Sequence, residues 1–140
     1  LGGLPGGARR GGGSVIQTSY FRAPGLPLER TVAISLTVPP WYKGRRYPDL
    51  APSRELLNNY QSRKWDWELY TAYYRAWVLD RLDPMEVGSD LTQEGDVILL
   101  CWGKWVPDLK CHRVLVATWL SFIEPVTEWG LTDAQMRAGV

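Results

Sequence analysis

Short apolar runs alternate with amphipathic stretches along this chain, and the alternation predicts strands separated by helices. Runs rich in apolar and β-branched residues predict strands at 15–18, 31–38 and 97–101. The run 97–101 is apolar throughout, which is typical of a central parallel strand that is buried on both faces. Residues 126–129 predict a last edge strand.

Between these strands, apolar side chains recur at the spacing of an α-helix, which predicts helices there. Ser53 is placed to cap a helix through about residue 60, and Asp66 to cap a longer helix through about residue 82, where Pro84 ends it. Residues 111–123 predict a further, largely buried helix. The pattern as a whole predicts an α/β fold with a mostly parallel sheet flanked by helices.

A parallel sheet also predicts where a ligand would bind. Ligands of open α/β sheets bind outside the carboxyl ends of the strands. The segments that follow Thr18, Val38 and Cys101 are therefore the expected places for a site.

The two ends of the chain carry weaker signals. Residues 1–13 contain seven glycines and predict a flexible tail with little to bury. Thr132 and Gln135 have the spacing of a capping box and predict a short final helix. We expect residues 14–140 to form a single domain.

Composition narrows the class of protein. With 140 residues, 45% hydrophobic, 22% charged and a net charge of +1, the sequence has the profile of one ordinary soluble globular domain. The longest apolar run, 97–102, is far shorter than the roughly 20 residues of a membrane span. Two cysteines make no disulfide framework, and no export signal is visible. We therefore expect a reducing, cytoplasmic setting, with no membrane partner and no cofactor.

The sequence is rich in aromatic residues, and its charged residues are unevenly distributed along the chain. Eight Trp and seven Tyr exceed what a small core needs, so some are expected to line a surface or cleft. Residues 1–64 carry ten Lys and Arg against three acids, whereas residues 65–140 carry six against twelve. The basic half could attract anions, or the two halves could neutralise each other in the fold.

Both cysteines and the sole histidine lie around one connection. Cys101 ends the predicted central strand, and Cys111, His112 and Arg113 open the next helix after a loop of nine residues, 102–110. A loop of that length is often functional. A cysteine in the first turn of a helix is exposed to the helix dipole and to unpaired amides, which favour the thiolate, and Arg113 adds a positive charge.

Three interpretations of this constellation remain open. Cys111 could be a nucleophile that His112 or Arg113 assists. Cys101, Cys111 and His112 could bind a metal, although three ligands are too few for a closed structural zinc site and their spacing matches no common zinc pattern. Both cysteines could instead be small buried hydrophobes, with His112 capping or packing.

The sequence resembles the domain-of-unknown-function 488 family in its short bacterial and phage form. Its Cys-His-Arg signature matches Cys111, His112 and Arg113. The resemblance implies a compact Rossmann-like α/β domain and a site at that signature, but no settled activity. The chain departs from the family at Gly103, where glutamate is usual, so any acid or base role of that glutamate would be missing. The other matching stretches are 18–21, 32–36, 40–47, 50–53, 82–84 and 97–102.

One segment interleaves aromatic rings with cations. Rings can stack on bases while cations hold phosphates, which suits single-stranded nucleic acid or a nucleotide. The rings could equally cover the core while the cations lie in water. The segment supplies Trp41, Tyr42, Lys43, Arg45 and Arg46, and Tyr20 could join the same rim; residues 60–67 repeat the composition.

These observations combine into one hypothesis, an anion-binding cleft with Cys111, His112 and Arg113 on one wall and the segment 41–46 on the other. Cys101 and Trp102 would border it. Cys111 would be the reactive thiol, Arg113 would hold the anion, and His112 would move a proton or orient. The ligand would be a nucleotide, a nucleic-acid end or another phosphate. The alternative is a non-catalytic nucleic-acid-binding or protein-interaction module, so the sequence leaves open whether the chain is an enzyme.

Overall fold

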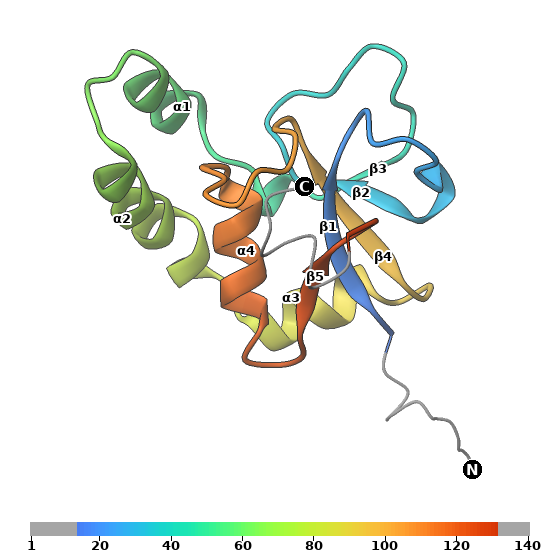
Figure 1. Cartoon of the computed structure of the whole chain (residues 1–140). Helices are drawn as coiled ribbons and strands as arrows, with labels where there is room; N and C mark the ends of the chain where they lie inside the picture. Colours follow the sequence, from blue (N-terminus) through green and yellow to red (C-terminus); the bar gives the residue numbers. More distant parts are fainter. Residues whose placement is uncertain (1–13, 132–140) are drawn as a thin grey trace.

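The computed structural model describes residues 14–131 and contains one sheet of five strands, all parallel. The strand order is β3-β2-β4-β1-β5, so β4 is central. Helices lie in the connection from β3 to β4 and in that from β4 to β5, and the parallel sheet flanked by helices confirms the predicted α/β class, in an arrangement consistent with a Rossmann-like fold (Figure 1). The strands are β1 (Ile16–Tyr20), β2 (Thr31–Ala33), β3 (Arg45–Arg46), β4 (Val97–Cys101) and β5 (Val126–Glu128).

The central strand is buried on both faces, as its unbroken apolar run predicts. All five residues of β4 are buried, and the strand pairs in parallel with β1 on one side and β2 on the other. Val97 and Leu99 enter one core cluster, whereas Ile98 and Leu100 enter another. The alternation follows from the two-residue period of a strand.

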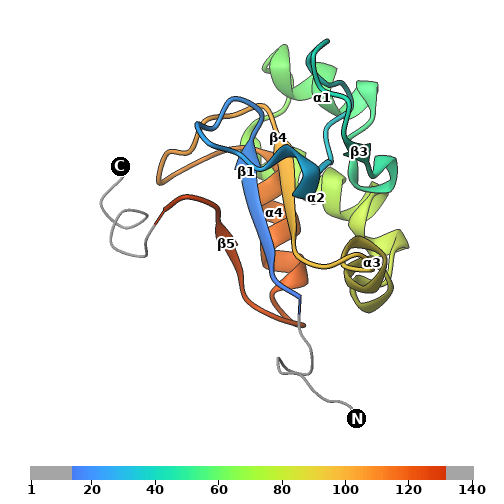
Figure 2. The same ribbon diagram turned by 90° about the vertical axis from the view of Figure 1, so that its right-hand side faces the viewer.

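The four helices pack on one face of the sheet. Each of them contributes buried side chains to the same core cluster as Val97 and Leu99, and Figure 2 shows α4 behind β1 and β4. The opposite face is covered by loop residues, among them Phe21 and Tyr42. The helices are α1 (Arg54–Gln61), α2 (Trp67–Trp77), α3 (Pro84–Leu91) and α4 (His112–Leu120).

Two of the helix starts are confirmed at the level of their caps. The hydroxyl of Ser53 accepts a hydrogen bond from the amide of Leu56, and the carboxylate of Asp66 accepts one from the amide of Leu69. The helix after Asp66 ends at Trp77 rather than at residue 82, and a single turn at 79–81 follows it.

One helix is absent from the sequence-based prediction. Pro84 was expected to end a helix, but it is the first residue of α3, and Asp83 caps the helix by accepting from the amide of Met85. Proline is well tolerated at this position, because its missing N–H would have no intrahelical partner there.

The second strand is shorter than its composition predicts. β2 ends at Ala33, and the chain then bends, with the Ser35 hydroxyl bonded to the carbonyl of Thr37. A serine that bonds its own backbone competes with strand pairing. The bend matters for function, because residues 35–37 line the cleft described below.

Several sequence-based expectations concern the chain ends or the membrane. The glycine-rich tail at 1–13 and the final helix at Thr132 lie outside the described residues. Within residues 14–131, no helix has the length and hydrophobicity that a membrane-spanning helix requires.

Candidate functional site

A cleft of about 440 Å³ opens where β2 and β4 end. Its floor is formed by the residues that follow β2 and by Cys101 and Trp102 at the end of β4. Cys111 and His112, at the start of α4, line it from one side, as the rule for parallel sheets predicts. The opposite side is formed by α1 and the beginning of α2. These helices contribute Arg54, Leu57, Tyr60, Gln61, Trp67 and Tyr70 to the lining.

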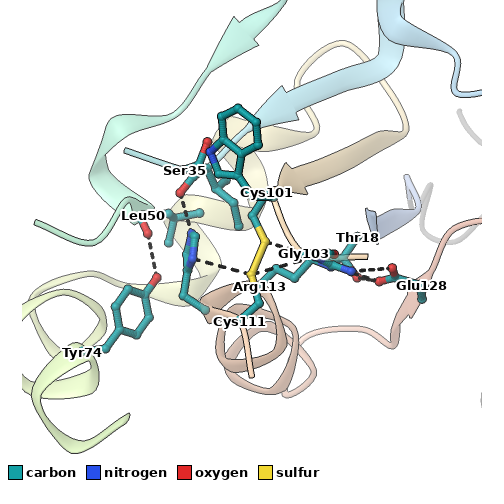
Figure 3. Close-up of a disulfide and its surroundings, with 12 residues drawn as sticks. Thr18, Ser35, Leu50, Tyr74, Cys101, Gly103, Cys111, Arg113 and Glu128 are labelled. Atoms are coloured by element: carbon teal, nitrogen blue, oxygen red, sulfur yellow. Dashed lines mark hydrogen bonds and ion pairs between the residues drawn. A yellow bond between two sulfur atoms is a disulfide. The ribbon is translucent and has the colours of Figure 1, made fainter. Parts of the chain in front are cut away.

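The two cysteines are joined by a disulfide (Figure 3). All three interpretations of the sequence treated them as separate thiols, so this is a correction. Their meeting has a topological cause, because the loop 102–110 leaves the end of β4 and returns to the beginning of α4 beside it. Cys101 is 1% exposed, whereas Cys111 is partly exposed and faces the cleft.

His112 is a buried, neutral histidine with a fixed tautomer. Its Nε2 lies 2.7 Å from the carbonyl oxygen of Ile34, which can only accept, so Nε2 carries the proton and Nδ1 keeps a free lone pair. Nδ1 lies 4.0 Å from the sulfur of Cys111. Burial, with a smaller contribution from the nearby charge of Arg113, lowers the pKa of His112 to about 4, and the hydrogen bond to the carbonyl of Ile34 opposes this shift. In the reduced chain, Nδ1 can therefore accept a hydrogen bond from the Cys111 thiol and orient it. The ring does not take up a second proton near neutral pH.

Arg113 lies inside the protein rather than in the cleft (Figure 3). Its Nη2 and Nε donate to the two carboxylate oxygens of Glu128, at 2.8 and 3.3 Å. Its Nη1 donates to the carbonyl of Gly103 at 2.6 Å and to the sulfur of Cys101 at 3.1 Å. The expectation that Arg113 holds a substrate anion is therefore wrong, because the residue is fully buried and every nitrogen of its guanidinium has an internal partner. Its charge is paired with Glu128, and its Nη1 is the atom that contacts the sulfur of Cys101.

The aromatic wall of the cleft comes from α1 and α2. Tyr60 lies 5.7 Å from Trp67 and 5.0 Å from Tyr70, measured between ring centroids, and Trp67 stacks on Tyr70 at 5.4 Å. Trp67 and Tyr60 are partly exposed. The cationic side chains in the lining are Arg54 and Lys110. Flat rings next to cations are the combination that was expected of segment 41–46.

Segment 41–46 does not form the second wall of this cleft. Tyr42 is buried, with its hydroxyl beside Thr31 and donating to the carbonyl of Arg45. Arg45 donates to two carbonyls at the end of α3, and Arg46 donates to that of Leu36. These bonds to backbone oxygens explain the error, because they use up cations that the sequence made available to a ligand. Lys43 is exposed and lines neither the cleft nor the two neighbouring cavities.

Of the other residues expected at the rim, only Trp102 lines the cleft, and Trp41, Arg46 and Tyr20 lie outside it. Trp102 lines it and donates through its indole N–H to the carbonyl of Thr37. Trp41 is exposed, and Phe21 separates it from Trp102, with centroid distances of 6.4 and 5.1 Å. Arg46 lines a neighbouring cavity, whereas Tyr20 lines a different one, beside Glu128 and Trp129.

Cys101, Cys111 and His112 are also the group that could bind a metal within the described part of the chain. Their ligand atoms lie within 4.8 Å of one another. In the disulfide state, however, the two sulfurs are bonded to each other and do not provide two thiolates. Metal binding would therefore require the reduced chain, and the Arg113 cation at 3.1 Å from the sulfur of Cys101 would oppose it.

The most important residue that the sequence-based reasoning missed is Glu128. It lies 15 residues after Arg113 on the edge strand β5, and Thr18 on β1 donates to the same carboxylate at 2.8 Å. A single acid in a predicted edge strand gives no signal in the sequence. Tyr60 and Trp67 carried a weak one, because the stretch 60–67 repeats the aromatic and basic composition of 41–46, whereas Arg54 carried none.

The fold and the site together define an α/β protein with a cysteine-containing cleft at the carboxyl edge of a parallel sheet. The chain belongs to the DUF488-N3a family, described as the active DUF488-N3 subclade, whose model matches residues 11–122. The matched range includes the cleft residues, Cys111 and Arg113, but ends before Glu128. No curated protein and no solved structure matches the chain.

Proposed function

We propose that the cleft binds a nucleotide, or the phosphate-bearing end of a nucleic acid, and that the reduced Cys111 attacks it as a nucleophile. The observation that carries the proposal is that one cleft brings together a partly exposed sulfur, an aromatic wall and two cations.

Binding is supported by the size and lining of the cleft. A cavity of about 440 Å³ is in the range of small-molecule sites, roughly 300–1,000 Å³. Trp67 and Tyr60 present partly exposed rings on which a base could stack, a contact that contributes about 1–3 kcal/mol per base in single-strand binding proteins. Arg54 and Lys110, the latter paired with the exposed Asp108, would face the phosphate, and α4 begins without a side-chain cap, so no side chain occupies the amides of its first turn.

Reactivity is supported by the groups around the sulfur. In the reduced chain, the Nδ1 atom of His112 can accept the thiol hydrogen and fix its direction. Because burial keeps this ring neutral, the proton leaves to solvent in the cleft, and the remaining thiolate is stabilised by Arg113 and by the start of α4. Arg113 and His112 are thus positioning residues.

The proposed step is a covalent transfer at phosphorus. The Cys111 thiolate forms a bond to phosphorus while the bond from phosphorus to the leaving oxygen breaks, and that oxygen takes a proton from solvent. Water then attacks the thiophosphate, which releases the phosphate product and restores the thiol.

The test uses the reduced chain and a panel of nucleoside mono-, di- and triphosphates together with a short oligothymidylate. Calorimetry should show saturable binding of at least one member, and Trp67→Ala should weaken it about tenfold, in line with the loss of one stacking contact. Trp77→Ala, an exposed tryptophan at the other end of α2, is the matched control and should leave binding unchanged. Mass spectrometry should then detect a phosphorus adduct on Cys111. Absence of saturable binding at low salt would refute the proposal.

A second candidate is a binding module without catalysis. It is favoured by the internal bonding of the signature, because Arg113 binds Glu128 and Gly103 while His112 binds Ile34. In that case, Trp41 and Lys43, which are both exposed, could bind a strand from outside the cleft. Cys111→Ala distinguishes the two functions, since it would abolish turnover in the first and leave affinity unchanged in the second.

A further inference from the structure

The disulfide between Cys101 and Cys111 removes the thiol on which the proposed reaction depends. Cys101 is the last residue of β4, and Cys111 is the N-cap of α4, so the bond fastens the two ends of the loop 102–110 across the cleft floor. While the bond is intact, Cys111 has no free thiol. The state of this one bond therefore determines whether the proposed nucleophile exists.

The two sulfurs differ in accessibility. Cys101 is 1% exposed and lies at the end of the central strand, whereas Cys111 is partly exposed at the cleft wall. Thiol–disulfide exchange begins with the attack of a thiolate on one sulfur, and access helps to decide which one. An incoming thiolate that enters the cleft reaches Cys111 first.

The two sulfurs also differ in their ability to leave. The Nη1 atom of Arg113 lies 3.1 Å from the sulfur of Cys101 and 3.9 Å from that of Cys111. A cation beside a sulfur stabilises its thiolate, and a better-stabilised thiolate leaves faster. Access and charge thus favour the same direction, attack at Cys111 and departure of Cys101.

We infer that Cys101 and Cys111 form a reversible thiol–disulfide switch, in which Cys111 is the exchanging sulfur and Cys101 the resolving one. This inference rests on the proposed function for its biological effect, but its chemistry can be measured without a substrate. The switch would make the activity of the cleft depend on the supply of a dithiol reductant.

Opening the switch takes two electrons from a dithiol. One reductant thiolate attacks Cys111, the bond between the two cysteines breaks, and Cys101 leaves as a thiolate. The second reductant thiol then attacks the reductant sulfur in the mixed disulfide, which releases Cys111 and yields the oxidised reductant.

Closing the switch requires a peroxide. The Cys111 thiolate takes one oxygen atom from hydrogen peroxide, which leaves a sulfenic acid on Cys111 and releases hydroxide. The thiol of Cys101 then attacks that sulfur, the disulfide forms and water departs. Each turn of the cycle consumes one dithiol and one peroxide.

The direction of exchange is tested with two matched single-cysteine variants. Cys101→Ser leaves Cys111 alone, and Cys111→Ser leaves Cys101 alone. With glutathione disulfide as the probe, intact-mass spectrometry should show Cys101→Ser forming a mixed disulfide at least tenfold faster than Cys111→Ser. Equal rates, or faster reaction of Cys101, would overturn the inference. Circular dichroism shows whether both variants are folded, and if either is not, mapping the first mixed disulfide formed on the native chain by glutathione decides the same point.

The switch itself is tested on the full chain. Dithiothreitol should open the disulfide under native conditions, and a small excess of hydrogen peroxide should close it again, as followed by alkylation and mass. A bond that opens only in denaturant would overturn the inference. So would a reduced chain that holds a stoichiometric zinc ion, because the sulfurs would then be metal ligands. Nucleotide binding is measured separately, so a working switch in a chain that binds no nucleotide would refute the proposed function alone.

Discussion

Glu128 on β5 holds the guanidinium of Arg113 on α4 through two hydrogen bonds, and both side chains are almost completely buried. The pair connects the edge of the sheet with the cleft, because the remaining nitrogen of Arg113 contacts Gly103 and the sulfur of Cys101. A buried ion pair contributes little net stability, but breaking it by removal of one partner leaves an uncompensated charge.

Replacement of Glu128 by glutamine should therefore destabilise the protein strongly. Glutamine keeps the shape of the side chain but leaves the charge of Arg113 uncompensated, and the expected loss is about 3–5 kcal/mol in the free energy of unfolding. Urea unfolding of the reduced chain measures it. The control is Asp108→Asn, which removes the exposed partner of Lys110 and should not change the unfolding midpoint. Similar midpoints for the two variants would contradict the importance of the buried pair.

His112 should remain neutral at every pH near neutrality. Its pKa, lowered to about 4 by burial, lies below the ordinary value of 6.5. Since it is the sole histidine, its ring protons can be followed by NMR without assignment, and their shifts should stay constant from pH 8 to about 5.5. A titration centred between pH 6 and 7 would show that the ring is not buried in solution.

The same lowered pKa has a consequence for stability. The unfolded chain takes up a proton at His112 near pH 6.5, and the folded chain only near pH 4, so stability falls as the pH decreases through that interval. His112→Gln keeps a donor for the carbonyl of Ile34 but cannot titrate. Between pH 6.5 and 4, thermal unfolding of this variant should depend less on pH than that of the native chain. Parallel curves would contradict the prediction.

The thiol of Cys111 in the reduced chain should be reactive at neutral pH. The charged and titratable groups around it are His112, Arg54, Tyr60 and two paired cations, Arg113 with Glu128 and Lys110 with Asp108, and the cations, which are closer to the sulfur or to the cleft, favour the thiolate. The rate of alkylation by iodoacetamide, followed against pH, should have its midpoint at about 7 or below, compared with about 8.5 for an ordinary cysteine. A midpoint at 8.5 or above would argue for a structural thiol and for the binding module.

Much of the fold could be predicted because local signals agree with the tertiary structure. The apolar run at 97–101 requires burial on both faces, and only the centre of a parallel sheet provides it. Ser53 and Asp66 are caps whose effect is local. The helix at Pro84 was missed because proline is compatible with both the end of one helix and the first turn of the next, and residue pattern does not distinguish these.

The site could be predicted only in part, for a similar reason. Cys101, Cys111 and His112 lie next to predicted element ends, and these ends are what the topology brings together. Glu128 reaches Arg113 because β5 pairs with β1, which places Glu128 beside Thr18. Thr18 and Glu128 are 110 positions apart in the sequence, and no local pattern encodes their contact. The prediction for the arginines of 41–46 was wrong because tertiary structure decides whether an arginine is hydrated or hydrogen-bonded to a backbone carbonyl, and Arg45 and Arg46 are bonded to carbonyls.

Gly103 offers a test of how charge controls the sulfur pair. A Cβ atom at this position would lie 3.9 Å from the Cβ of Cys111, 4.0 Å from the guanidinium of Arg113, and a tight 3.3 Å from Leu109. Gly103→Glu therefore places a carboxylate next to the thiolate and its cation, while Gly103→Gln introduces the same bulk without the charge. The carboxylate should repel the thiolate and draw Arg113 from the sulfurs, so the alkylation midpoint of Cys111 should be about one pH unit higher in the glutamate variant than in the glutamine variant. Identical midpoints would mean that Arg113 does not act on the sulfurs, and its burial with Glu128 would then be purely structural.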